Sequence, residues 1–229
     1  YKYDKKGNQI EKARYNSDGS LTRKDIYKYD KKGNQIEQAF YNSDGVLLRK
    51  DTYKYDKKGK KIESATYDSN GYLVLKCNID NTGNYIERAY YNSDESLWMK
   101  QTYKCDEKGN YLEMVKYEKY GYLKAKETYK YDEKGKKIEW AKYNSDGSLK
   151  EKKQYKYDSN GKKIEKIEYN FKSDGSLNFK YKFDNKGNRI EQTYYNSDGT
   201  LTRKYTYKDG VLFSEKNYMN DEKEIEIAE

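Results

Sequence analysis

The sequence predicts an all-β fold: a tandem-repeat antiparallel β-meander of about 16 or 17 strands with no large globular core. Three observations lead to this prediction. One turn motif returns about every 26 residues, a second turn motif lies inside each repeat, and strand-like segments separate the two. Every connection is short and hairpin-like, so successive strands are expected to pair antiparallel.

The first turn motif is the tetrad Asp-x-x-Gly. Aspartate at the first position and glycine at the fourth are typical of a tight turn that ends in a left-handed glycine. A fixed period of this length indicates a repeat architecture. The motif occurs eight times, with six intervals of 26 residues and one of 24, beginning at Asp4, Asp30, Asp56, Asp80, Asp106, Asp132, Asp158 and Asp184.

The second turn motif has the same chemistry and appears first as Asn16-Ser17-Asp18-Gly19. The segments between the two turns are 8 to 10 residues long and rich in Tyr, Thr, Ile and Leu, which is typical of β-strands. We therefore expect eight two-strand repeats over residues 1–208. A C-terminal β cap over 209–229 would contain the Asp209-Gly210 turn and the alternating segment Glu224–Ile227.

The composition limits how such a sheet can be built. Only 34% of residues are hydrophobic while 38% are charged, and the mean hydropathy is −1.43. Thirty tyrosines supply rings that can cover apolar surface while their hydroxyls stay in water. A second packed layer is therefore not expected. Either the sheet is a single extended layer, or it coils into a shell because the pairing register shears by two residues per repeat.

The turns also predict which side chains share a face. If Asn16 lies opposite Ser20, then Ile10 lies opposite Ile26. Alternation along the strands then gives one face, the predicted tyrosine face, on which a glutamate recurs eight times from Glu11 onwards beside tyrosine ladders.

The other face, the predicted basic face, would carry a lysine that recurs eight times from Lys24 onwards. A further lysine recurs on it from Lys28 onwards. Few acidic residues fall on this face in the predicted register, so it is expected to hold the net charge of +9. It is either a solvated outer face or an anion-binding surface.

Residues that the fold requires should repeat, whereas residues that serve one specific site should not. The departures from the repeat fall on the predicted basic face, where Lys142 is expected opposite Lys150 and Tyr90 opposite Trp98. The apolar departures either stiffen the sheet or form a stacking platform for a sugar or a protein patch. The lysines are either solvated or anion-binding. The candidate binding residues are Phe40, Leu48, Tyr90, Trp98, Met114 and Trp140, with Lys100, Lys116, Lys124, Lys126, Lys142 and Lys150.

No catalytic, cofactor-binding or metal-binding residue is predicted. The chain has no histidine, and nearly every carboxylate belongs to an eightfold set, whereas a general acid and base need different environments. No phosphate-loop, dinucleotide or nucleophile-elbow motif occurs. The predicted register separates Cys77 and Cys105 by two strand spacings, beyond disulfide reach, so both are expected to be free thiols. A non-enzymatic protein is expected.

The segment Tyr27-Lys28-Tyr29-Asp30-Lys31-Lys32-Gly33-Asn34-Gln35-Ile36 resembles the tyrosine–aspartate (YD) repeats of Rhs-type proteins and teneurins, which share a Tyr-x-Tyr-Asp-x-x-Gly core. The likeness covers almost the whole chain. It implies hairpin sheets that spiral into hollow shells, on secreted or surface proteins that mediate contact or enclose a toxin. The unit here is longer, and Asn-x-Ile stands where the family favours Arg-Leu. The chain equally resembles the single-layer central sheet of spirochaete outer-surface lipoproteins.

These patterns favour a secreted or cell-surface scaffold that presents its sheet for adhesion, with a protein or glycan surface as partner. The first alternative is a polyanion, either nucleic acid or acidic glycan, bound on the predicted basic face. The second is a structural spacer or filament with edge-to-edge self-association, or a toxin-enclosing shell fragment. No apolar run is long enough for a membrane-spanning helix. The chain opens inside a repeat at Tyr1, so a trimmed fragment of an extracellular or surface protein is expected.

Overall fold

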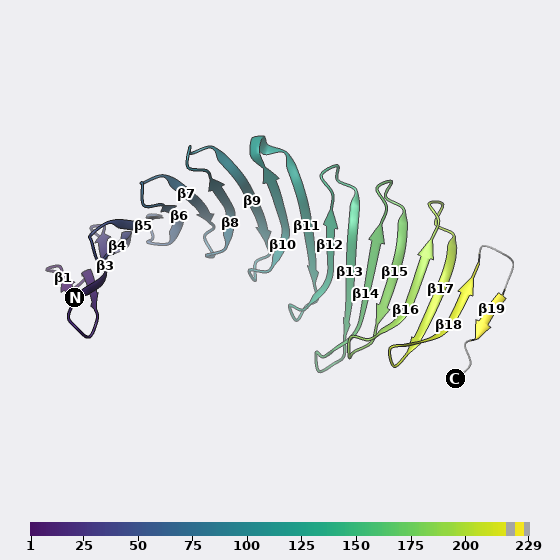
Figure 1. Cartoon of the computed structure of the whole chain (residues 1–229). Helices are drawn as coiled ribbons and strands as arrows, with labels where there is room; N and C mark the ends of the chain where they lie inside the picture. The colour runs from purple at the N-terminus through teal and green to yellow at the C-terminus, as the bar shows by residue number, and fades with distance from the viewer. Residues whose placement is uncertain (219–222, 227–229) are drawn as a thin grey trace. The chain divides into compact units, whose positions relative to one another are not determined.

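A computed structural model describes residues 1–218 and 223–226 of the chain (Figure 1). Almost all of its regular structure is β, with one short 3-10 helix, η1 (Lys119–Gly121). The chain divides into two compact units. The first comprises Tyr1–Gly109 and Lys116–Tyr122, and the second Asn110–Val115 and Leu123–Glu229. The predicted all-β repeat meander is confirmed.

The first unit is built from antiparallel hairpins in which each strand pairs with the next along the chain. Strand β10 (Tyr111–Glu118) is shared between the two units. The strands of the first unit are β1 (Lys2–Tyr3), β2 (Gln9–Tyr15), β3 (Leu21–Tyr29), β4 (Gln35–Asn42), β5 (Leu47–Tyr55), β6 (Lys61–Tyr67), β7 (Leu73–Ile79), β8 (Tyr85–Tyr91) and β9 (Leu97–Cys105).

The second unit continues the same pattern of consecutive antiparallel strands. Its strands are β11 (Leu123–Tyr131), β12 (Lys137–Tyr143), β13 (Leu149–Tyr157), β14 (Lys163–Phe171), β15 (Leu177–Phe183), β16 (Arg189–Tyr195), β17 (Leu201–Lys208), β18 (Val211–Asn217) and β19 (Lys223–Glu226). The repeats thus supply β1–β17, the predicted number. Asp209 and Gly210 turn β17 into β18 with φ angles of 51° and 85°. The extent of the C-terminal cap stays a prediction, and Ile227 lies outside the described residues.

Aspartate and glycine make the first turn of each repeat in the way their chemistry predicts. The Asp30 carboxylate accepts hydrogen bonds from the main-chain N–H groups of Lys32 (2.8 Å) and Asn34 (2.9 Å). Gly33 has a φ of 90° and donates its N–H to the Asp30 carbonyl (3.1 Å). A left-handed residue is required there, and glycine adopts that conformation without steric cost.

The pairing register shifts by one residue beside each turn, and this overturns the predicted faces. Tyr15 lies opposite Leu21 as expected, but Arg14 lies opposite Arg23, so Thr22 is an extra, bulged residue. A bulge of this kind moves every following side chain to the other face relative to its partner strand. Ile10 therefore does not face Ile26, whose partner is Glu11.

The observed sheet has two faces of different character. The glutamate face carries the eight recurring glutamates together with both recurring lysine sets: Lys24 lies opposite Ala13, and Lys28 opposite Glu37. The prediction of a separate basic face is wrong for this reason. The variable face is the opposite one, and it changes from repeat to repeat at the positions occupied by Arg14, Phe40, Thr66, Tyr90, Lys142, Glu168 and Tyr194.

No large side chain among the described residues is fully buried. The buried hydrophobic positions are mostly alanines of the glutamate face, namely Ala39, Ala65, Ala89 and Ala141, together with Cys77 and Ile79. Within each unit the stability therefore depends on the hydrogen-bonded ladder and on cross-strand side-chain pairs, each worth roughly 0.2–1 kcal/mol.

Candidate interaction surfaces

The glutamate face holds a ladder of cross-strand ion pairs. Glu139 shows the pattern: its two carboxylate oxygens lie 2.8 Å from the ammonium groups of Lys130 and of Lys152. Glu63 is bracketed in the same way by Lys54 (2.8 Å) and Lys76 (3.1 Å). The repeated glutamates and lysines thus neutralise one another's charges, so their role is structural.

This ladder perturbs the titration of its carboxylates. Partial burial by itself raises the pKa of Glu139. Hydrogen bonds from Lys130, Lys152 and Gln154, with the charge of Lys152, outweigh burial and lower the pKa to about 2. Glu139 is therefore charged at every physiological pH.

The predicted lysine cluster does not form one uncompensated basic patch. Lys100 pairs with Glu87 (2.7 Å) and Lys126 with Glu113 (2.6 Å), both on the glutamate face. Lys142 lies on the variable face, where its strand partners are Glu151 and Glu127; the predicted partner, Lys150, is therefore wrong. Of the remaining lysines, Lys116 belongs to the first unit and Lys124 to the second.

The predicted apolar residues are divided between the two units. Phe40, Leu48, Tyr90 and Trp98 belong to the first unit, and Met114 and Trp140 to the second. The strand partner of Tyr90 is Met99, not Trp98, yet the rings of Tyr90 and Trp98 meet edge-on with centroids 6.3 Å apart. Whether any of these residues binds a ligand stays a prediction.

Phe40 takes part in a charged cluster on the variable face instead of packing on Leu48. The guanidinium carbons of Arg23 and Arg49 lie 4.5 Å and 5.7 Å from the centre of its ring. Arg23 also pairs with buried Asp25 (2.6 Å), and Arg49 with buried Asp51 (2.7 Å). Cation–π contacts and ion pairs thus hold β3, β4 and β5 together on this face.

Trp140 is likewise held by neighbours. The carboxylate of Glu127 accepts hydrogen bonds from the Trp140 indole N–H (2.9 Å) and the Tyr129 hydroxyl (2.8 Å). The ammonium group of Lys153 lies 5.1 Å from the centre of the Trp140 ring. Burial, followed by the hydrogen bond to Glu127, raises the pKa of Tyr129 well above its ordinary value. A stiffening role accounts for these contacts.

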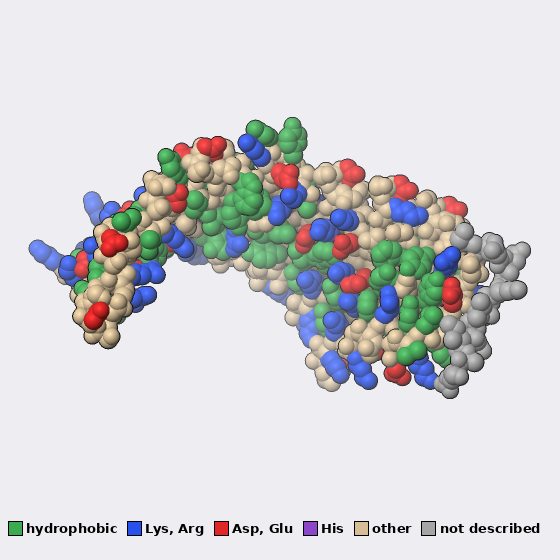
Figure 2. Space-filling view, in the orientation of Figure 1, with side chains coloured by type: hydrophobic (Ala, Val, Ile, Leu, Met, Phe, Trp, Pro, Cys, Tyr) green, Lys and Arg blue, Asp and Glu red, His purple; other side chains and the backbone are tan. Residues whose placement is uncertain are grey.

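A cluster of aromatic rings that was not predicted lies on the variable face of β15, β16 and β17, where hydrophobic side chains gather in Figure 2. Phe179 stacks on Tyr181 with centroids 4.7 Å apart, and Tyr194 meets both Phe179 and Tyr205 at 6.1 Å. The sequence signal was available, since Tyr181 and Tyr205 stand where other repeats have Asp, Cys, Gln, Glu or Lys.

A groove of about 530 Å³ opens beside this cluster. Tyrosines and polar side chains line it, without any aliphatic residue: Gln192, Tyr194, Tyr195, Asn196, Thr202, Arg203, Tyr205 and Tyr207. Gln192 is buried and accepts hydrogen bonds from Arg189 (2.7 Å) and Tyr207 (3.2 Å). Tyrosine-rich surfaces with a few fixed polar groups are typical of recognition sites.

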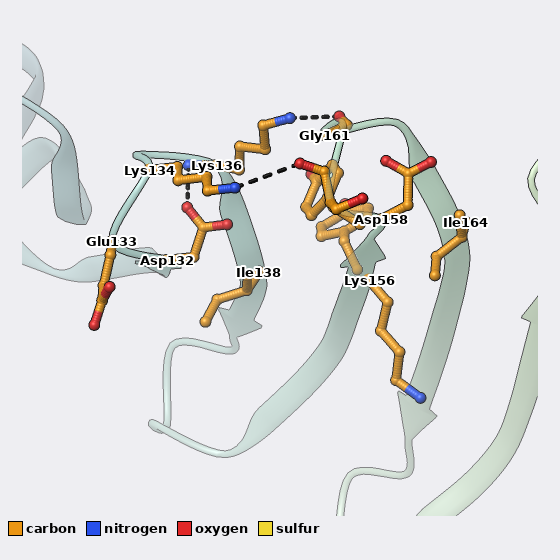
Figure 3. Close-up of a pocket in the computed structure, with 12 residues that line it drawn as sticks. Asp132, Glu133, Lys134, Lys136, Ile138, Lys156, Asp158, Gly161 and Ile164 are labelled. Atoms are coloured by element: carbon orange, nitrogen blue, oxygen red, sulfur yellow. Dashed lines mark hydrogen bonds between the residues drawn. The ribbon is translucent and has the colours of Figure 1, made fainter.

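A second kind of groove lies between the first turns of neighbouring repeats. Figure 3 shows the example beside Ile138 and Ile164, with a volume of about 580 Å³. The ammonium group of Lys136 donates to the Gly161 carbonyl across it. The equivalent groove beside Ile36 has almost the same volume, about 570 Å³. Since the repeat generates both grooves, neither is a specific site.

All six arginines of the sequence lie on the variable face: Arg14, Arg23, Arg49, Arg88, Arg189 and Arg203. The glutamate face uses lysine alone for its ladder. Arginine stacks on aromatic rings better than lysine does. Arg88 lies 4.2 Å from the centre of the Tyr85 ring, and Arg189 5.2 Å from that of Tyr181. The variable face therefore combines aromatic rings with guanidinium groups.

Both cysteines are free thiols. Cys77 is buried on the variable face opposite Ser64 and Arg88, and burial raises the pKa of its thiol.

Among residues 1–218 and 223–226, no group of acidic or cysteine side chains is placed to hold a metal ion. The described part of the chain also contains no helix long and apolar enough to cross a membrane.

Comparison with known proteins leaves the family open. No protein-family model matches the chain, and no curated protein sequence matches it. Among solved structures, the chain is similar to the TcdB2-TccC3 crystal structure, with 12% identity over 94% of this chain and a TM-score of 0.34. It spans 17% of that much longer protein. A porin-like protein from Bacteroides uniformis is similar at 11% identity, over 94% of this chain and 90% of the other, with a TM-score of 0.29. TM-scores this low do not establish a shared fold, so the YD-repeat pattern remains a resemblance carried by the Tyr-x-Tyr-Asp-x-x-Gly motif.

Proposed function

We propose that this chain is a non-enzymatic scaffold of a secreted or cell-surface protein, which contacts a protein or glycan partner through residues that do not repeat. The observation that supports this proposal is the division of labour between the faces. The glutamate face repeats the same ion pairs, whereas the variable face changes its chemistry from repeat to repeat on an unchanged backbone. Variation of surface chemistry on a fixed scaffold is how binding proteins acquire specificity.

We also propose that the chain is not an enzyme. Catalytic acids and bases need distinct environments, whereas the repeated glutamates all lie in the same ladder, paired with one or two ammonium groups, as at Glu37 and Glu139. The perturbed titration of Glu139 follows from this structural ladder.

Binding to immobilised mucin tests the proposal against a surface that presents both protein and glycan. Two variants change a side chain of the variable face to the one found at the same position in another repeat. Tyr90→Thr introduces the residue of the preceding repeat, Thr66, and Tyr194→Lys introduces the residue found two repeats earlier, Lys142. A control, Lys54→Gln, lies on the glutamate face. We expect the variable-face variants to weaken binding about tenfold, as hot-spot tyrosines do, and the control less than twofold. Loss of binding in the control alone would contradict the proposal.

Polyanion binding is the second candidate, because several repeats bring two lysines to the recurring glutamate, as at Glu63, Glu139, Glu165 and Glu191. Lys54 and Lys130 keep 67% of their side-chain surface exposed despite their ion pairs. Affinity for heparin or single-stranded DNA should then fall steeply between low and moderate salt. The combined variant Lys54→Gln/Lys130→Gln should reduce the salt dependence. Unchanged binding in that variant would rule out the glutamate face as the polyanion site.

A further inference from the structure

Four of the five second turns in the first unit differ from those of the other repeats. Each carries at least one exposed apolar or aromatic side chain, and together these are Val46, Leu48, Tyr72, Trp98, Tyr120 and Tyr122. Tyr120 stands where every other repeat has aspartate or asparagine. At the positions of Val46 and Leu48, the four repeats outside the strip have polar residues: Ser20, Thr22, Ser148, Lys150, Ser176, Asn178, Thr200 and Thr202. We call the six residues the aromatic turn strip; Figure 2 shows hydrophobic side chains projecting at the turn that contains η1.

The strip is continuous along four consecutive repeats of one unit. Turns of successive repeats are separated by two strand spacings, about 9.5 Å. Trp98 remains 57% exposed even though its ring touches Tyr90, and Tyr120 is 80% exposed. Strand β9, which begins within the third of these turns, contacts η1 in the fourth, so these two turns lie side by side.

The fold does not require these apolar side chains. The other repeats make the same turn with polar residues at these positions, so the turn itself does not need an apolar side chain. Tyr120 also adopts a left-handed conformation, with a φ of 67°, that is unfavourable for a tyrosine. Contiguous exposed apolar patches on soluble proteins usually mark interaction sites, and burying one such side chain gains roughly 1.5–3 kcal/mol.

The charges around the strip indicate the chemistry of the partner. Its four turns, residues 42–48, 68–74, 92–98 and 118–122, contain five carboxylates and one ammonium group, on a chain whose net charge is +9. The carboxylates are Asp44, Asp68, Asp94, Glu95 and Glu118. A negative rim around an apolar strip complements a positive rim and disfavours anionic membranes.

We propose that the aromatic turn strip binds an amphipathic protein segment that presents apolar side chains flanked by lysine or arginine. This inference rests on the proposed scaffold function and deepens it: it names the chemistry of a protein partner and places its contact on the turn edge of the first unit. The apolar side chains of the segment cover Tyr72, Trp98 and Tyr122, and its basic side chains meet the turn carboxylates.

Tryptophan fluorescence tests this directly, because the chain has only two tryptophans. In a Trp140→Phe background, Trp98 is the sole reporter. The probe is a synthetic peptide of alternating leucine and lysine, compared with serine–lysine and leucine–glutamate peptides of equal length. We expect a saturable blue shift with the leucine–lysine peptide and at least tenfold weaker binding of the other two.

Two variants restore the polar residue of the other repeats on the reporter background, Tyr72→Ser and Tyr122→Ser. Each should weaken binding of the leucine–lysine peptide about fivefold, and the pair more than tenfold. The matched control is Tyr15→Ser, which removes a tyrosine outside the strip whose exposure, 63%, lies between those of Tyr72 (43%) and Tyr122 (71%), and which should change the affinity less than twofold. Circular dichroism and the urea midpoint verify folding of each variant.

Three results would overturn the inference: equal binding of all three peptides, unchanged affinity in Tyr72→Ser/Tyr122→Ser, or a Trp98 shift with phosphatidylserine vesicles but not with the leucine–lysine peptide. These failures are separable from failure of the scaffold proposal. The mucin experiment includes Tyr194→Lys, in the second unit, which leaves the strip and its contacts unchanged, whereas Tyr90→Thr removes the ring that touches Trp98.

Discussion

The hydroxyl of Tyr29 donates a hydrogen bond of 2.9 Å to the main-chain carbonyl of Gln9, on the neighbouring strand. The same bond recurs from Tyr55 to Gln35, at 2.8 Å. Each acceptor immediately precedes the bulged isoleucine, where the regular ladder is interrupted. The second tyrosine of the Tyr-x-Tyr-Asp motif therefore satisfies a main-chain carbonyl beside the bulge, although Ile79, Cys105 and Phe183 replace it in three of the eight repeats.

Removing that hydroxyl should destabilise the first unit. Tyr55→Phe leaves the Gln35 carbonyl without this donor, and we expect a loss of about 1 kcal/mol in the free energy of unfolding. Urea denaturation measures it. Tyr67→Phe is the control, since the Tyr67 ring serves Lys50 as a cation–π partner at 4.6 Å and should tolerate loss of its hydroxyl. Equal effects of the two variants would contradict the assigned role.

The ion ladder predicts a dependence of stability on acid. Because folding lowers the pKa of Glu139 to about 2, its contribution is complete above the ordinary glutamate pKa, near 4.5, and is lost as the pH falls through 2. Glu139→Gln should cost about 1 kcal/mol at pH 7, given two partly exposed ion pairs.

Urea unfolding of wild type and Glu139→Gln at pH 7, 4 and 2 checks this dependence. The difference between the two proteins should shrink towards zero at the lowest pH. Glu107→Gln, in an exposed turn, is the matched control and should show little difference at any pH. A difference for Glu139→Gln that persists at pH 2 would show that packing, not charge, is responsible.

The second turn formed by residues 92–96 contains a strained residue, and a substitution should relieve that strain. Glu95 occupies the position that glycine holds in the other turns and has a φ of 60°. Glu95→Gly should raise the free energy of unfolding by about 0.5 kcal/mol, because relief of left-handed strain exceeds the entropic cost of glycine. The reciprocal variant Gly45→Ala, at φ 77° with open space around its Cβ, should lower it by about 1 kcal/mol. Thermal denaturation checks both predictions: the melting temperature should rise in Glu95→Gly and fall in Gly45→Ala.

The buried carboxylate of Asp51 is a charged position on the variable face whose loss should be costly. It is 4% exposed, pairs with Arg49 through two hydrogen bonds and accepts a third from Thr66 (2.7 Å). Asp51→Asn removes the charge but keeps the shape, and should cost about 2–3 kcal/mol. Asp44→Asn, in an exposed turn, should cost less than about 0.5 kcal/mol. Similar urea midpoints for the two variants would contradict this ranking.

The candidate surfaces were predicted only in part, for a physical reason. Departures from the repeat can be seen in the sequence, so Phe40, Tyr90 and Trp140 were identified as unusual. Their partners could not be identified, because partners depend on register. A shift of one residue paired Phe40 with Arg49 instead of Leu48 and Lys142 with Glu151 instead of Lys150. The cluster around Phe179 and Tyr194 was missed because the contacts that Tyr194 makes with Phe179 and Tyr205 form only across strands, although Phe179 and Tyr181 lie two residues apart on β15.

Local chemistry determined the turns, the strand lengths and the antiparallel order. Asp30 and Gly33 make the first turn through hydrogen bonds and a left-handed φ that involve neighbours in sequence only. The tertiary structure decided which face each strand presents. The bulge at Thr22 places Lys24 and Glu11 on one face, and a bulge depends on how two strands fit together across a hairpin. Because side chains alternate with a period of two, that single extra residue turned a predicted basic face into a ladder of compensated charges.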